Sequence, residues 1–195
     1  MISDTKVVAI GGGTGLSTML KGLKLHTHNI TAVVTVADDG GSSGILRSDL
    51  GMLAPGDVRN CVSALAEVDP VMGELLNFRF KDGSLKGHSL GNLFLAALNE
   101  TSSSFDEAVK KFSHLTGVVG TVYPVTNESV TLSALLEDGR LIEGESHIGV
   151  HHDGPKNGIV KLMVNPEKPK AVDGVIKALE KADIIVLGPG SLYTS

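Results

Sequence analysis

The first apolar run of the chain leads directly into a cluster of glycines. Val7–Ile10 is short and apolar, as expected of a buried strand, and the amphipathic run Leu16–Leu25 beyond the glycines is typical of a helix. Glycines between a strand and a helix let backbone N–H groups close on an anion, and the helix dipole favours the same ligand. We therefore predict that this turn binds phosphate through Gly11, Gly12, Gly13, Thr14 and Gly15.

The glycine spacing matches neither common nucleotide-binding fingerprint. A dinucleotide-binding G-x-G-x-x-G that starts at Gly11 has Leu16 in place of its last glycine, and one that starts at Gly13 has Thr18 there. A Walker A loop is excluded because the chain contains no Gly-Lys pair. A tight turn with a glycine-rich N-cap is the structural alternative.

A second apolar run, Thr31–Ala37, has the composition of a buried parallel strand. Two acids and a Gly/Ser stretch follow it, which we expect to form a flexible loop. Carboxylates beside a phosphate turn hold ribose hydroxyls or a divalent cation, and serine hydroxyls donate to oxyanions. The alternative is a solvated loop whose acids cap the next helix. The candidate ligand-binding residues here are Asp38, Asp39, Gly40, Gly41, Ser42 and Ser43.

The end of the chain repeats this pattern, with a strand at Asp183–Leu187 followed by another small-residue loop. In an open α/β sheet, ligands bind beyond the carboxyl ends of the strands, so three such segments are expected to meet at one edge. Together they offer the backbone donors, acids and hydroxyls that suit a nucleoside diphosphate. The candidates in this third segment are Gly188, Gly190, Ser191, Tyr193 and Thr194.

Two further groups of polar residues stand at predicted helix starts. Asp57 and Arg59 flank the start of a helix at Val58–Glu67, where they hold a metal or phosphate or else cap and charge the helix terminus, with Asp57 as N-cap. His88, Ser89 and Asn92 precede the apolar helix Leu93–Leu98. They either bind an anion or serve as buried caps. We predict Asp39 and Asp57 as metal ligands.

Other reactive side chains do not form a recognisable site. Glycines and Pro155 interrupt a histidine-rich segment, which indicates an irregular loop rather than a metal-binding helix. That segment contains His147, His151, His152 and Asp153. The lone Cys61 shares a helical face with apolar residues and is expected in the core, and Ser191 lacks a G-x-S-x-G elbow.

Composition limits the class of protein. With 42% hydrophobic residues and a net charge of −5, the chain is typical of a globular protein without an electrostatic motive to bind nucleic acid. We find no signal peptide and no long apolar segment, so we expect a cytoplasmic protein without membrane insertion. One cysteine excludes a disulfide framework.

The order of predicted elements indicates the fold class. Further helices are expected at Thr14–Lys24, Val71–Leu76, Phe105–Leu115 and Ala171–Lys181. Between residues 118 and 164 the apolar period changes to two, with a hairpin closed by Asp138-Gly139. We therefore predict an α/β fold: one Rossmann-like nucleotide-binding domain over residues 1–195, with a mostly parallel sheet, helices on both faces and a small antiparallel β insertion at about 118–164. Because the chain stops in a strand-to-loop element, we expect it to be part of a longer protein.

Five motifs, spread over almost the whole chain, resemble the YvcK/CofD-like family, most closely its YvcK branch, the gluconeogenesis factors of bacteria. They are Gly11-Gly12-Gly13-Thr14-Gly15, Ala37-Asp38-Asp39-Gly40-Gly41-Ser42-Ser43-Gly44, Pro55-Gly56-Asp57-Val58-Arg59, His88-Ser89-Leu90-Gly91-Asn92 and Gly188-Pro189-Gly190-Ser191-Leu192-Tyr193-Thr194-Ser195. Each motif is weak alone, and the combination is specific. Members of this family continue well past the last motif, so part of the expected base pocket lies beyond it.

The resemblance implies a UDP-sugar ligand, such as UDP-N-acetylglucosamine, and a role in cell shape and wall synthesis during gluconeogenic growth. It also implies cell-wall synthesis proteins as partners and a homo-oligomer. The CofD branch transfers a phospholactyl group from a guanosine diphosphate conjugate to a deazaflavin precursor, with the counterparts of Asp39 and Asp57 near the phosphates and metal. That branch has bulkier residues where this chain has residues 38–43, which argues against deazaflavin binding.

Three functions follow from the sequence as hypotheses. The first is a regulatory protein that binds a UDP-sugar without turnover, because no general base is identifiable. The second is a phosphotransferase, for which Asp39, Asp57 and Mg²⁺ would suffice, since phosphoryl transfer depends mainly on positioning and charge. The third is an NAD-binding protein, because Asp38 has the place of a ribose-binding acid, although the glycine fingerprint does not fit.

Overall fold

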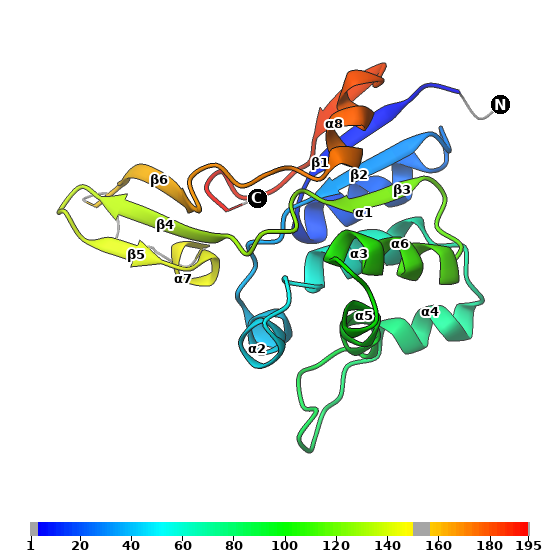
Figure 1. The fold of residues 1–195 in the computed structure, drawn as a ribbon, viewed down its shortest axis with the longest axis horizontal. Coiled ribbons are helices and arrows are strands. Elements are labelled where there is room, and N and C mark those ends of the chain that lie inside the picture. Colours follow the sequence, from blue (N-terminus) through cyan, green and yellow to red (C-terminus); the bar gives the residue numbers. More distant parts are fainter. Residues whose placement is uncertain (1–3, 150–156, 195) are drawn as a thin grey trace.

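Four parallel strands form the main sheet of the protein in the computed structural model, which describes residues 4–149 and 157–194. The strands are β1 (Val7–Gly11), β2 (Ile30–Val34), β3 (Thr121–Pro124) and β7 (Ile184–Leu187), in the order β3-β2-β1-β7. β1, β2 and β7 are apolar and largely β-branched, the composition of strands that are covered on both faces. The predicted parallel α/β sheet is therefore confirmed (Figure 1).

Helices cover both faces of this sheet, as predicted. On one face, α1 (Gly13–Leu23), α3 (Gly56–Leu65) and α6 (Phe105–Leu115) bury their apolar sides, and the core there includes Leu16, Leu65 and Phe112. On the other face, Val175 of α8 (Asp173–Glu180) and the N-cap residue Val172 pack against the strands. Figure 1 shows α8 on the side of the strands opposite α3 and α6. Cys61 is fully buried in the larger core, as predicted.

Two further helices form an outer layer on the α6 side. α4 (Pro70–Asn77) packs against α5 (Leu90–Glu100), and α5 packs against α6 (Figure 1). Side-chain caps fix where they begin: Asp69 accepts from Val71 N–H, and Ser89 accepts from Asn92 N–H. The prediction of Asp57 as a cap of α3 is wrong, because that helix begins at Gly56 and Asp57 lies inside its first turn.

The segment after β2 differs from the prediction. We expected a flexible loop at residues 38–44, but Gly41–Leu50 forms a helix, α2. Its Gly/Ser-rich first turn has low helix propensity, and contacts elsewhere stabilise it. Leu46 is buried in the core, Arg47 donates to the carbonyls of residues 36, 37 and 38, and Gly51 ends the helix at φ 64°.

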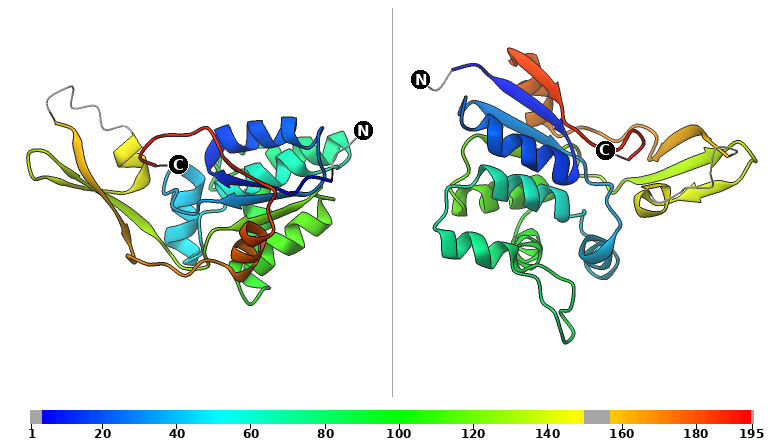
Figure 2. Two further views of the ribbon diagram at one scale, coloured as in Figure 1. Left: turned by 90° about the horizontal axis from the view of Figure 1, so that it is seen from above. Right: turned by 180° about the vertical axis from the view of Figure 1, so that it is seen from behind.

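The small antiparallel sheet consists of β4 (Thr131–Leu136), β5 (Leu141–Glu143) and β6 (Ile159–Asn165), in the order β5-β4-β6. The hairpin between β4 and β5 is confirmed, with Gly139 at φ 85° in the turn. The predicted start of this insertion at residue 118 is too early, because β3 pairs parallel with β2 in the main sheet. The small sheet projects to one side of the main sheet (Figure 2).

One short helix, α7 (Glu145–Gly149), follows β5 where a strand end and loop were expected. It packs on β4 and buries Ile148. Among the helices of the described residues, none combines the length and apolar character needed to cross a bilayer.

Candidate functional site

The turn between β1 and α1 has glycines because its neighbours leave no room for side chains. A Cβ on Gly12 would overlap Cγ2 of Thr35 and lie 2.8 Å from Asp57 Oδ2, and a Cβ on Gly15 would overlap the carbonyl oxygen of Pro189. Gly13 has φ 61°, a left-handed conformation that favours glycine. The tight glycine turn that we gave as the structural alternative is therefore present, and phosphate binding by this turn stays a prediction.

This turn leaves backbone donors open. The Gly13 N–H donates to the Asp57 carboxylate. Within residues 4–149 and 157–194, no acceptor binds the N–H groups of Thr14 or Gly15. Unpaired N–H groups at the start of an 11-residue helix carry the partial positive charge that binds anions.

The C-terminal loop lies against the same turn. Gly188 N–H donates to Ile10 O at 2.7 Å, and the Thr194 hydroxyl donates to the Glu145 carboxylate. The structure thus brings Gly188 and Thr194 to the site. Gly190, Ser191 and Tyr193 are exposed, and the Ser191 hydroxyl accepts from Tyr193 N–H within the loop.

The start of α2 adds a second open helix terminus. Gly40 is the N-cap residue, and its N–H donates to Asp38 Oδ1 at 3.0 Å. In the described part of the chain, no acceptor binds the N–H groups of Gly41, Ser42 or Ser43. Ser43 Oγ accepts from Gly56 N–H at 3.2 Å, which joins α2 to the start of α3. The predicted convergence of segments at the carboxyl edge of the sheet is present.

Four acids share this edge, and the pKa values of two of them, Asp57 and Glu145, are raised. Burial, together with the charges of Asp38 and Glu145, raises the pKa of Asp57 to about 6, against the hydrogen bond from the Gly13 N–H and the charge of Arg59. Burial also raises the pKa of Glu145, as do the charges of Asp38 and Asp39, against the hydrogen bond from Thr194. The site therefore concentrates negative charge beside two positive helix ends.

The two predicted metal ligands have different surroundings. Asp39 Oδ1 accepts from Ser146 N–H at 2.8 Å, so this carboxylate caps α7, whereas Asp38 is the aspartate whose charge raises the pKa of Asp57. No group of three histidine, cysteine or acidic side chains within the described residues is arranged to hold a metal ion. The residues His151, His152 and Asp153 lie outside the described residues, and His147 Nδ1 bonds Glu143 O at 2.8 Å.

A buried polar network joins the predicted residues at the start of α5 to the site. The Ser42 hydroxyl lies 2.9 Å from His88 Nδ1, and Asn92 Nδ2 donates to the same hydroxyl. Arg59 is 7% exposed and donates to the side-chain oxygens of Asn92 and Asn77. Burial and the charge of Arg79 lower the pKa of Arg59, and Asp57 opposes this shift.

Sequence reasoning missed two residues that shape the site. Glu145 reaches it from α7, and Arg47 ties the β2–α2 connection to the small sheet through Val130 O at 2.8 Å. Neither has a local sequence pattern that marks it as functional. Their roles depend on how the small sheet packs against the main one.

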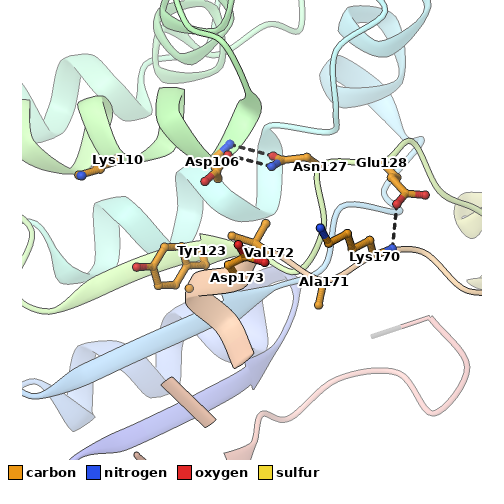
Figure 3. A pocket seen from close by; sticks show the side chains of 10 residues that line it. Asp106, Lys110, Tyr123, Asn127, Glu128, Lys170, Ala171, Val172 and Asp173 are labelled. Carbon is orange, nitrogen blue, oxygen red and sulfur yellow. Dashed lines mark hydrogen bonds between the residues drawn. The ribbon is translucent and has the colours of Figure 1, made fainter. Parts of the chain in front are cut away.

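A separate hollow of about 410 Å³ lies beside β3, between α6 and the start of α8 (Figure 3). Two of its three acids are already bonded: Asp106 pairs with Asn127 through two hydrogen bonds, and Glu128 accepts from Lys170 N–H. None of the residues predicted for ligand binding lines it. The candidate site is therefore the edge where the starts of α1, α2, α3 and α5 come together.

Comparisons with known proteins agree with this architecture. The family model described as 2-phospho-L-lactate transferase CofD matches residues 7–195. The chain is 54% identical over 195 residues to a protein of Clostridium acetobutylicum and 47% identical over 193 residues to the Bacillus subtilis protein named gluconeogenesis factor. The first match includes 100% of this chain and 43% of the Clostridium protein. The second includes 97% of this chain and 59% of the Bacillus protein.

A solved structure shows the same fold. The crystal structure of a Bacillus halodurans protein described as a member of the UPF0052 family matches with a TM-score of 0.91 and 45% identity, over 99% of this chain and 61% of that one. The motifs, fold and relatives agree. The chain belongs to the CofD family, on the branch of the gluconeogenesis factors.

Proposed function

We propose that this protein binds a nucleoside diphosphate sugar, such as UDP-N-acetylglucosamine, across the open starts of α1 and α2. The observation that carries the proposal is the pair of neighbouring helix termini whose N–H groups at Thr14, Gly15 and Gly41–Ser43 have no acceptor among the described residues. Two adjacent anion sites suit two linked phosphates better than a single anion. The hydroxyl of Thr14 and the nearby acids supply the remaining polar contacts.

Mg²⁺ fits this proposal as a bridging ion. Asp57 and Asp38 repel each other when both carboxylates are charged. A cation bound near them and the phosphates would reduce that repulsion. Mg²⁺ commonly uses one or two carboxylates and takes its other ligands from phosphate and water. Asp39, the other predicted ligand, would have to leave Ser146 to take part.

The names of the relatives suggest the biological role. A Bacillus subtilis relative is named gluconeogenesis factor, and we propose that the complete protein senses a UDP-sugar and adjusts wall synthesis and cell shape during gluconeogenic growth. In this role the ligand is released unchanged. Cell-wall synthesis proteins would be its partners, and light scattering of the complete protein would test the homo-oligomer that we expect.

A transferase is the second candidate, because Asp57 has a pKa of about 6 beside the phosphate turn and the matching family model is described as a transferase. A carboxyl group with a pKa near the working pH can exchange a proton during catalysis. An NAD-binding protein is less well supported, since Asp38 Oδ1 already accepts from Gly40 N–H instead of a ribose hydroxyl.

Recovery of the ligand separates a sensor from a transferase. We expect UDP-N-acetylglucosamine incubated with the protein and Mg²⁺ to be recovered intact by chromatography. Free UDP or UMP that forms in proportion to the protein, and that is absent with Asp57→Asn, would favour the transferase. Asp82→Asn is the matched control, because Asp82 is exposed and lies outside the site motifs.

A further inference from the structure

A line of hydrogen bonds runs through buried side chains from α3 through α5 to α2. Arg59 Nε donates to Asn92 Oδ1 at 3.3 Å, and Asn92 Nδ2 donates to Ser42 Oγ at 3.1 Å. Ser42 Oγ in turn lies 2.9 Å from Nδ1 of His88. The side chains of these four residues are between 2% and 8% exposed, so water has little access to replace the hydrogen bonds between them.

The donor groups of these side chains determine which atom donates in each hydrogen bond. A guanidinium has only donors, so the Asn92 atom that faces Arg59 is the amide oxygen, and the amide nitrogen faces Ser42. Ser42 Oγ therefore accepts from Asn92. Among the described residues, its own proton has one acceptor in reach, the Nδ1 atom of His88. A proton on Nδ1 instead would leave the buried hydroxyl proton without a partner, which is unfavourable.

The other ring nitrogen is left to act as a donor. Nε2 of His88 has no hydrogen-bond partner among the described residues. In the same residues, the only fully buried side-chain polar atoms without a hydrogen-bond partner are the hydroxyls of Ser63 and Ser113, and Nε2 is not one of them. Nε2 therefore keeps contact with solvent, on a residue bonded to the open first turn of α2. A hydrogen bond made by one ring nitrogen sets which nitrogen carries the proton.

We propose that Arg59, Asn92 and Ser42 are positioning residues that keep the proton of neutral His88 on Nε2, so that His88 donates to a phosphate oxygen of the ligand. The identity of that acceptor rests on the proposed function. The tautomer itself does not, because every bond that sets it is present without ligand. The buried arginine thus acts on the ligand at a distance of three hydrogen bonds.

The tautomer is measured in ligand-free protein labelled with ¹⁵N, by long-range proton–nitrogen correlation at pH 8. Comparison with His88→Gln assigns the ring. We expect a single tautomer with the proton on Nε2. Asn92→Asp keeps the side-chain shape but can only accept, so the Ser42 proton turns toward it and His88 must donate from Nδ1. We expect the proton to move to Nδ1 in that variant.

Asn99→Asp is the matched control, since it makes the same change farther along α5, and it should leave His88 unchanged. A wild-type proton on Nδ1, or an unchanged tautomer in folded Asn92→Asp, would overturn the proposal. If Asn92→Asp does not fold, Ser42→Ala serves instead. It should convert the single tautomer into the mixture found in a free histidine side chain, and a single tautomer there would equally refute the relay.

Binding tests the donor role separately, with UDP-N-acetylglucosamine and pyrophosphate as probes in calorimetry. We expect His88→Ala to weaken binding at least tenfold, and His88→Gln to stay within about threefold of wild type because its amide N–H replaces Nε2–H. Equal losses in both variants would contradict a donor role for Nε2. If wild-type protein binds neither probe, the proposed function fails, whereas the tautomer result stands or falls by itself.

Discussion

The pKa of Asp57 depends on several opposing effects at the site. Its carboxylate accepts from Gly13 N–H, which favours the charged form, while burial, Asp38 and Glu145 favour the protonated form and together raise its pKa to about 6. In the unfolded chain the same group titrates near 3.8. The folded protein therefore holds a proton between these values that the unfolded chain releases.

Asp57→Asn should show this cost of burial as a pH-dependent gain in stability. The raised pKa makes a contribution to folding stability that is fully present below about pH 4 and is lost as the pH rises through about 6. We expect the variant to exceed wild type by about 2–3 kcal/mol at pH 7 and by much less at pH 4, measured by urea unfolding. Asp82→Asn should show no such trend, and a loss of stability at every pH would mean that the bond to Gly13 dominates.

Gly12 offers a test of close packing in the turn between β1 and α1. We expect Gly12→Ala to destabilise the protein by about 1–3 kcal/mol, because its methyl group meets Cγ2 of Thr35. Thr35→Ser removes that methyl group but keeps the hydroxyl that accepts from Ala37 N–H. In urea unfolding the double variant should therefore recover part of the loss, and strict additivity would show that the two groups do not meet.

At the scale of residues, the sequence indicated the glycines, Asp38, Asp57 and the polar group at the start of α5, because each follows a strand or begins a helix. It did not indicate Glu145 or the bonds of Arg47. These residues reach the site only because the small sheet packs near α2, a contact between segments far apart in the chain. No local period or spacing encodes such a contact.

At the scale of elements, strands with continuous apolar runs were the most predictable part. The helix α2 was missed because its ten residues include two glycines and three serines, which disfavour a helix locally. Arg47 and Leu46 override that preference through tertiary contacts. The strand β3 was assigned to the wrong sheet, since its alternation does not reveal which partner it pairs with.

Two glycine substitutions test how α2 ends. Gly51→Ala should destabilise the protein by about 1 kcal/mol, because φ 64° disfavours a side chain although the space around it is open. Gly22→Ala, also in open space but inside α1, should stabilise it by about 0.5–1 kcal/mol. Thermal unfolding of the two variants gives the comparison. If both variants changed the stability in the same direction, the backbone conformation at Gly51 would not determine the change in stability.

At the scale of the whole molecule, the proposed phosphate-binding edge of the described residues is framed by two sheets. The small sheet brings Glu145 through α7, and the main sheet brings the starts of α1 and α2. The longer relatives have further residues beyond the matched region, since the chain covers 59% of the Bacillus subtilis protein. We therefore expect phosphate recognition in this chain and base recognition to depend on the complete protein.

Calorimetric titration of UDP-N-acetylglucosamine with Mg²⁺ into Thr14→Glu and Thr18→Glu, in the complete protein, tests the central claim most directly. Both residues are exposed on α1, one turn apart, so both variants carry the same added charge. A glutamate at position 14 is favourable for the helix but repels an anion at its open N–H groups. We predict unchanged folding in both, with affinity lost at least tenfold in Thr14→Glu and nearly retained in Thr18→Glu. Equal affinities in the two variants would contradict a phosphate site at the start of α1.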